Sequence, residues 1–152
     1  MPYSTITGIG HYVPKNVVTN QDLTKVMETS DEWIRERTGI EERRYITKGK
    51  ETTTTLALEA SEKAIADAGI DKNDIDFIIF CTLSPDYYFP GAGVLLQREL
   101  GIAKTEIAAL DIRAQCSGFV YGLTTADQYI KSGMYKKILV VGAEVHSVGL
   151  DF

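Results

Sequence analysis

Cys116 is the residue of this sequence whose type and position could most directly do covalent chemistry. It follows an apolar stretch, 107–112, and precedes an amphipathic helical pattern that continues to Tyr129. Free amide groups and the dipole at a helix start favour an anion, and the thiolate is the reactive form of cysteine. Gly118 and Gly122 would allow close approach and deep packing of this helix. The position predicts a nucleophile, although inert packing is the common role of a lone cysteine in an apolar stretch.

The other cysteine, Cys81, ends the continuous apolar run 75–81 and is expected to be a small buried hydrophobe. The two cysteines are too far apart for a CxxC redox pair. With only two histidines in the chain, no metal-ligand cluster is expected either.

The elements that must position Cys116 are expected to alternate between strands and helices. Predicted strands cover 3–9, 75–82, 106–112 and 137–141, and predicted helices start near 21 and 30 and cover 52–68, 90–100 and 117–131. Either Thr29 or Ser30 could cap the second helix, Thr29 with Glu32 resembles a capping box, and Gly39 and Gly69 suit helix ends. This alternation predicts one α/β unit with a mostly parallel sheet, whose ligand sites lie where strands end and helices begin.

Bulk composition excludes several classes of protein. The 152 residues suit one domain, and 44% hydrophobic and 24% charged residues are ordinary for a globular chain. A net charge of −5 disfavours nucleic acid and anionic membranes as partners. The chain has neither an apolar run of the ~20 residues that span a bilayer nor the build of a signal peptide, so a cytoplasmic protein is expected.

Several motifs in order along the chain resemble one enzyme family, β-ketoacyl-acyl-carrier-protein synthase III. The matching stretches are 29–34, 37–40, Arg43, 51–52, 66–70, 89–90, 116–119, 126–133 and 140–142. The resemblance implies an α/β thiolase-like fold, layered αβαβα when complete, with a mostly parallel mixed sheet. This chain would cover most of the first half of that fold.

The resemblance also implies an activity. The family member takes an acyl group from acyl-CoA onto a cysteine, here Cys116, and condenses it with malonyl-acyl carrier protein. Acyl transfer and decarboxylative carbon–carbon bond formation are then separate steps, and backbone amides, that of Cys116 among them, stabilise the oxyanion. The expected partners are acyl-CoA, malonyl-acyl carrier protein and a second copy in a homodimer; acyl-CoA is a substrate, and no cofactor is expected.

Four further positions match the family's binding residues. Trp33 matches the aromatic residue that stacks on the adenine of CoA, and Thr29 and Arg37 match its polar contacts, roles that suit a stacking ring and a phosphate-pairing guanidinium. Phe89 matches the residue that one subunit inserts into the acyl pocket of the other. Without the resemblance, Trp33 would be read as a core or interface anchor, Arg37 as a solvated residue and Phe89 as a cover for a helix start.

The chain departs from the family pattern at several places. The family's catalytic histidine and asparagine lie in a second half, and neither His11 nor His146 lies in a matching segment. Residues 1–152 are therefore expected to be a truncated amino-terminal domain that needs the missing carboxy-terminal half. The departures near the acyl pocket are Arg113 and Gln115 before the nucleophile, and Tyr87 and Tyr88 before Phe89.

Three alternatives stay open at this point. Gly8 and Gly10 after a predicted strand suggest a dinucleotide-binding loop, but Val13 replaces the third glycine of the GxGxxG motif. A related thiolase-fold enzyme of secondary metabolism would share the same first half, whether it makes a polyketide or quinolone or transfers an acyl group to oxygen. An inactive half that works only with a partner chain is the third.

Overall fold

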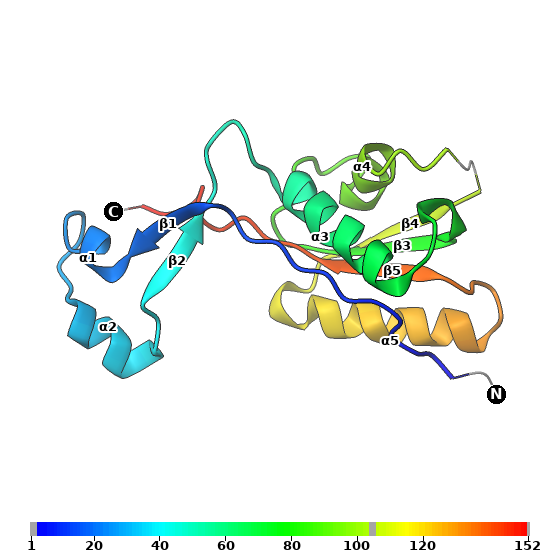
Figure 1. Cartoon of the computed structure of the whole chain (residues 1–152), viewed down its shortest axis with the longest axis horizontal. Coiled ribbons are helices and arrows are strands. Elements are labelled where there is room, and N and C mark those ends of the chain that lie inside the picture. Colours follow the sequence, from blue (N-terminus) through cyan, green and yellow to red (C-terminus); the bar gives the residue numbers. More distant parts are fainter. Residues whose placement is uncertain (1–2, 104–105, 152) are drawn as a thin grey trace. The chain divides into compact units, whose positions relative to one another are not determined.

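The computed structural model describes residues 3–103 and 106–151 and divides into two compact units. The first unit consists of Met1–Tyr12 and Thr52–Glu144, and the second of Val13–Glu51 and Val145–Phe152. Each unit has its own sheet, and each is described separately below (Figure 1).

A three-stranded parallel sheet forms the centre of the first unit. Its strands are β3 (Phe77–Cys81), β4 (Ala108–Ile112) and β5 (Ile138–Gly142), in the order β4-β3-β5. The register pairs Cys81 with Ile112 on one side and with Gly142 on the other, so the three strands end together. Parallel pairing confirms the predicted α/β topology, because parallel neighbours need crossover helices.

Helices cover both faces of this sheet. In Figure 1, α3 (Thr53–Ala68) and α4 (Ala92–Glu99) lie on one face and α5 (Gly118–Lys131) on the other. Alternate residues of β3 serve the two sides: Ile78 and Phe80 pack with Ala57 and Leu96, whereas Ile79 packs in a second cluster. All five β3 residues are buried, as the continuous apolar run predicts for a central strand.

The ends of α3 follow the local rules that the sequence suggests. The Thr52 side chain accepts a hydrogen bond from Thr55 N–H at the start, and Gly69 ends the helix with φ of +63°. A short 3₁₀ helix, η1 (Lys72–Asp74), then leads into β3. Glycine suits the position after Ala68, because residues that carry a Cβ atom rarely adopt this left-handed backbone conformation.

The predicted first strand, Tyr3 to Ile9, is wrong: this segment pairs with no strand and is extended along α3 instead. The Ile9 N–H donates to the Asp67 carboxylate at 2.9 Å, and Lys63 donates to the His11 carbonyl at 3.0 Å. β-propensity describes a segment that fits an extended conformation, but it does not supply a partner strand.

Gly8 and Gly10 are explained by this contact with α3. A Cβ atom at Gly8 would collide with the carbonyl oxygen of Ala64, and one at Gly10 with that of Ala60. The glycines therefore permit a close approach between two backbones, and no helix begins after them before Asn20. The dinucleotide-binding alternative is wrong, since such a loop must lead from a strand directly into a helix.

The second unit contains an antiparallel pair and two short helices. β1 (Asn16–Thr19) pairs with β2 (Glu42–Tyr45), while α1 (Asn20–Leu23) and α2 (Asp31–Thr38) lie between them in sequence. The two helices start near the predicted positions, and Gly39 ends α2 with φ of +70°. The sequence analysis predicted neither strand. Glu42–Tyr45 has the sequence ERRY, and three charged residues in four are not typical of a strand.

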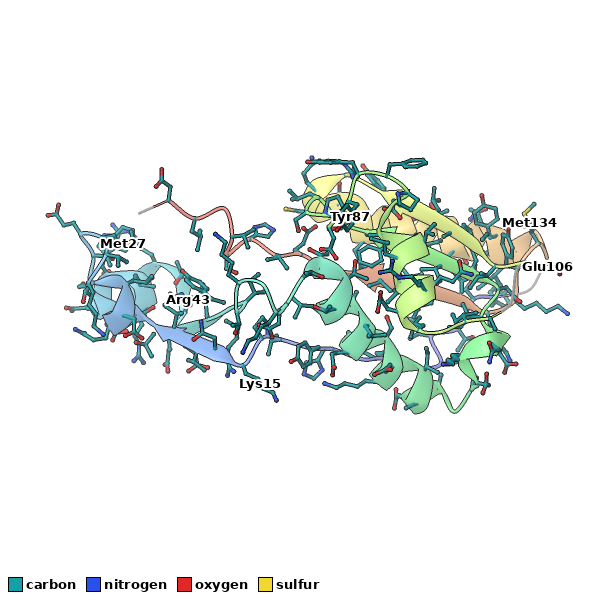
Figure 2. The ribbon with its side chains drawn as sticks, turned by 90° about the horizontal axis from the view of Figure 1, so that it is seen from above. Lys15, Met27, Arg43, Tyr87, Glu106 and Met134 are labelled. Carbon is teal, nitrogen blue, oxygen red and sulfur yellow. The ribbon has the colours of Figure 1, made fainter. Side chains whose placement is uncertain are left out.

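Buried Asn20 is the polar centre of this second unit. Its amide group donates to the Asp31 carboxylate and to the Ile40 carbonyl, both at 2.7 Å. Its oxygen accepts from the Arg43 guanidinium at 2.7 Å; Arg43, labelled in Figure 2, lies on β2. One satisfied buried amide thus connects the start of α1 with α2 and β2, and its hydrogen bonds offset the cost of burial.

Candidate active site in the first unit and candidate nucleotide-binding helix in the second

Cys116 lies exposed at the edge where all three parallel strands end. It is the central residue of a one-turn 3₁₀ helix, η2 (Gln115–Ser117), which follows β4 and leads directly into α5 at Gly118. The predicted place of this cysteine, beside a helix start at a strand-to-helix turn, is confirmed. Open α/β sheets bind ligands at this end, outside the carboxyl ends of their strands.

The backbone around Cys116 is bent so that the thiol is presented to solvent. Gln115 has φ of +48°, the one non-glycine residue with positive φ among the described residues. The Ser117 hydroxyl donates to the Ala114 carbonyl at 2.8 Å and closes the turn. Such a conformation costs a side-chain-bearing residue about 1–3 kcal/mol and occurs preferentially at functional sites.

Cys81 lies beneath this turn and is the structural cysteine, as predicted. Only 4% of its surface is exposed, and Gly118 and Gly122 of α5 pack over it. Burial, and then the nearby negative charge of Asp111, raise the pKa of the Cys81 thiol to about 11. At neutral pH this thiol is protonated, so it lacks the thiolate form that attacks thioesters.

A loop, residues 82–91, joins β3 to α4 and carries three exposed aromatic residues. Tyr87, Tyr88 and Phe89 are 64%, 81% and 89% exposed. Figure 2 labels Tyr87, which belongs to this loop. Three exposed aromatic side chains in succession are unusual for a surface loop and indicate a contact surface.

Carboxylates hold both ends of this aromatic loop in place. Glu144 accepts hydrogen bonds from Leu83 N–H at 2.8 Å and from the Ser84 hydroxyl at 2.7 Å. Asp111 accepts from the N–H groups of Ala92 and Gly93, at 2.6 and 2.8 Å, at the start of α4. Charge-assisted hydrogen bonds of this length are about twice as strong as neutral ones, so the loop ends are well fixed.

Asp86 ties the middle of the loop to a different helix. Its carboxylate accepts from Thr53 N–H at 2.9 Å and Thr54 N–H at 3.1 Å, at the first turn of α3. None of the three carboxylates was singled out from the sequence. Asp111 could have been noticed from the sequence, because it is the charged residue in the otherwise apolar strand Ala108–Ile112, shortly before the predicted nucleophile.

Arg113 links the nucleophile segment to the aromatic loop. Its guanidinium carbon lies 4.4 Å from the centre of the Tyr88 ring. This distance is well inside the ~6 Å over which a cation is attracted to a ring face. The structure thus brings together two of the departures from the family pattern that the sequence placed 25 positions apart.

In the second unit, α2 presents Trp33 and Arg37 together. Trp33 is 53% exposed, and the Arg37 guanidinium lies 4.6 Å from the centre of its ring. The helix starts at Ser30, whose hydroxyl accepts from the Trp33 N–H at 3.1 Å. One exposed helix face therefore offers a flat aromatic ring beside a positive charge, groups that can stack on a base and pair with a phosphate.

The predicted capping box at Thr29 is wrong, because Ser30 occupies the N-cap position of α2. The Thr29 hydroxyl oxygen is buried and has no hydrogen-bond partner among the described residues. Thr29 and Ser30 are adjacent hydroxyl residues, so the sequence alone located the start of α2 only to within one position. This is the usual uncertainty of a helix start.

The predicted site residues fall into both units. Cys116 and Phe89 belong to the first unit, and Thr29, Trp33 and Arg37 to the second. Among residues 3–103 and 106–151, no group of three histidine, cysteine or acidic residues is placed to hold a metal ion. Within the same residues, no helix has the length and apolar character needed to cross a membrane.

Comparisons with known proteins agree with this arrangement. A family model described as 3-oxoacyl-[acyl-carrier-protein (ACP)] synthase III matches residues 110–152, which include the end of β4, Cys116 and α5. A curated β-ketoacyl-[acyl-carrier-protein] synthase III 1 of Bacillus cereus is 51% identical over 147 residues, 97% of this chain and 46% of the relative. The chain belongs to the 3-oxoacyl-[acyl-carrier-protein] synthase III family. It corresponds to the amino-terminal half of its members and spans about half the length of the curated relatives it matches.

Solved structures confirm the thiolase-like α/β fold class. The 3-oxoacyl-[acyl-carrier-protein] synthase III of Aquifex aeolicus matches with a TM-score of 0.90 and 46% identity, covering 96% of this chain and 46% of that one. The priming β-ketosynthase of the R1128 polyketide biosynthetic pathway matches with a TM-score of 0.88 and 32% identity, over 93% of this chain and 42% of that one. One fold thus serves relatives that are named for two different products.

Proposed function

We propose that this chain supplies the acyl-accepting half of an enzyme that initiates fatty-acid synthesis. The observation that carries the proposal is the exposed Cys116 on a strained turn, at the common end of three parallel strands and at the start of α5. Family membership supports the same reading.

The proposed reaction has two balanced steps. The Cys116 sulfur attacks the acyl-CoA thioester carbonyl, and CoA leaves as its thiol, which leaves the acyl group on Cys116. Malonyl-acyl carrier protein then loses CO₂, and the resulting carbanion attacks the Cys116 thioester, which forms the 3-oxoacyl product and regenerates the cysteine. The Cys116 N–H is one proposed donor to the oxyanion.

The histidine and asparagine that would assist decarboxylation are expected in a carboxy-terminal half, because neither His11 nor His146 lies in a matching segment. We further propose a homodimer in the cytoplasm, with Phe89 of each copy near the acyl pocket of the other. Acyl-CoA is a substrate in this scheme, and the chemistry invokes no cofactor or metal.

The test of this function is a condensation assay on the native protein, together with any carboxy-terminal half that it carries. Short-chain acyl-CoA and malonyl-acyl carrier protein are expected to give a 3-oxoacyl thioester on the carrier and one CO₂ per product. Product that forms without acyl-CoA, or a Cys116 acyl adduct that malonyl-acyl carrier protein does not consume, would contradict it. The second result would favour the inactive half.

CoA binding at α2 can be tested separately, because Trp33 is the only tryptophan in the sequence. CoA is expected to change the fluorescence of Trp33 by stacking its adenine on the ring. Replacing Arg37 by alanine is expected to weaken CoA binding about tenfold, the typical effect of losing a hydrogen bond to a charged group.

Arg35→Ala is the matched control on the same helix, since Arg35 pairs with Glu41 at 2.8 Å and with Asp31 at 3.8 Å. Exposed ion pairs of this kind contribute little to stability, so the CoA affinity of Arg35→Ala should stay near that of the parent. Equal losses in the two variants would mean that α2 supplies only general positive charge.

A second candidate function is the priming step of polyketide synthesis. The fold match to a priming β-ketosynthase, with a TM-score of 0.88 and 32% identity, supports it. Competition between acetyl-CoA and longer acyl-CoA primers distinguishes the two, because a polyketide priming enzyme would be expected to prefer the longer primer.

A further inference from the structure

The aromatic loop is held at its ends by strong hydrogen bonds, but its central side chains lack burial. Glu144 holds Leu83 and Ser84, and Asp111 holds the start of α4. Between them, Tyr87, Tyr88 and Phe89 project into solvent. Their positions therefore depend on contacts other than packing in a core, because exposed side chains lose little by changing rotamer.

The Arg113 guanidinium supplies such a contact, since it lies 4.4 Å from the Tyr88 ring centre. Arg113 stands three residues before Cys116, on the short connection between β4 and η2. Asp111, near the end of the preceding strand β4, holds the far end of the aromatic loop with its carboxylate. The loop is thus attached twice to the segment that carries the nucleophile.

We propose that Arg113 and Tyr88 are a specificity-determining pair: the guanidinium fixes Tyr88, and through it the adjacent Phe89, and so selects which acyl groups Cys116 accepts. The inference rests on the proposed function, in which Cys116 is acylated and Phe89 of one copy lines the acyl pocket of the other copy in a homodimer. Pocket walls distinguish acyl chains that differ by one methylene only by about 10- to 200-fold, and only when they are held in place. A loosened wall reduces that ratio.

The experiment is a competition between acetyl-CoA and butyryl-CoA for Cys116 in the native protein, read as the ratio of the two adducts by intact-mass spectrometry. Arg113→Gln removes the charge and Tyr88→Leu removes the ring. Each is expected to change the ratio about two- to fivefold, the range that a cation–π contact at an exposed site supports. The double variant should change it no further, because both substitutions break one contact.

Two conservative variants separate this role from general damage. Arg113→Lys keeps a cation and Tyr88→Phe keeps the ring, so both should stay close to the parent ratio. Amide hydrogen exchange provides a readout that does not require acylation. Peptides covering 86–91 are expected to exchange about two- to fivefold faster in Arg113→Gln than in the parent, and at the parent rate in Arg113→Lys.

The outcomes distinguish this inference from the proposed function. If the parent protein forms no adduct, the proposed function is wrong, and the proposed role in acyl selection fails with it. A parent that forms adducts, with the same ratio in Arg113→Gln, would overturn the specificity role alone. Unchanged hydrogen exchange in Arg113→Gln would show that the guanidinium does not hold the loop, which also overturns it.

Discussion

Replacing Cys116 by alanine is expected to abolish the acyl adduct that the native protein forms with short-chain acyl-CoA. The substitution removes the sulfur that attacks the thioester, and loss of a catalytic nucleophile lowers the rate on the order of a thousandfold or more. Folding should be unaffected, because Cys116 is exposed and alanine leaves no cavity there. Intact-mass spectrometry measures the adduct directly, and hydroxylamine, which cleaves thioesters, should remove it.

Cys81→Ala is the matched control, because it removes the other cysteine of the chain. Burial, and then the charge of Asp111, raise the pKa of the Cys81 thiol to about 11, so at pH 8 only about one molecule in a thousand has the thiolate. Thiol alkylation at pH 8 should therefore label Cys116 and leave Cys81 unmodified, and Cys81 should become ionised only as the pH approaches 11. An adduct that persists in Cys116→Ala and disappears in Cys81→Ala would reverse the assignment of the nucleophile.

Replacing Gly122 by alanine is expected to lower the free energy of unfolding by about 1–2 kcal/mol. The added Cβ atom would lie 2.5 Å from the Cys81 sulfur and 3.3 Å from a Val140 methyl carbon, on the face where α5 packs on the sheet. Overpacking of this kind costs about 1–3 kcal/mol, occasionally more, and the better helix propensity of alanine offsets up to about 1 kcal/mol of it. Urea denaturation of the native protein measures the change.

Gly118→Ala is the control in the same helix. Its nearest neighbour would be the Cys81 Cβ atom at 3.8 Å, an ordinary van der Waals distance, so its stability should stay within about 0.5 kcal/mol of the parent. Removing the Cys81 sulfur should relieve the Gly122→Ala clash, so the double variant should be more stable than the sum of the single effects implies. Strict additivity would show that Cys81 is not the group that limits the approach of α5.

Much of the fold was predictable because its signals are local. The Phe77–Cys81 run is apolar at every position, so a strand covered on both faces was the simplest reading, and the structure buries all five residues. Gly39 and Gly69 end their helices with positive φ, since glycine adopts that conformation at little cost. Cys116 was found by the same route, because a strand pattern turning into a helix pattern marks the end of a parallel strand.

Apart from the one-residue shift at the start of α2, the wrong or missing predictions concern features whose partners are distant in sequence. Residues 3–9 have the composition of a strand, but Gly8 and Gly10 instead permit contact with the α3 backbone about 50 residues away. Glu42–Tyr45 is too polar to read as a strand and forms one because Asn16–Thr19 pairs with it. Strand pairing depends on a partner that propensity does not identify.

By itself, the sequence determined the family, the α/β class, and the identity and location of the candidate nucleophile, because each depends on residue type and on short-range spacing. Only the tertiary structure showed that Asp86, Asp111 and Glu144 hold the aromatic loop, and that Arg113 lies over Tyr88. Those contacts join residues separated by 18 to 61 positions. They arise because parallel strands place their carboxyl ends side by side, and this alignment exists only once the sheet has formed.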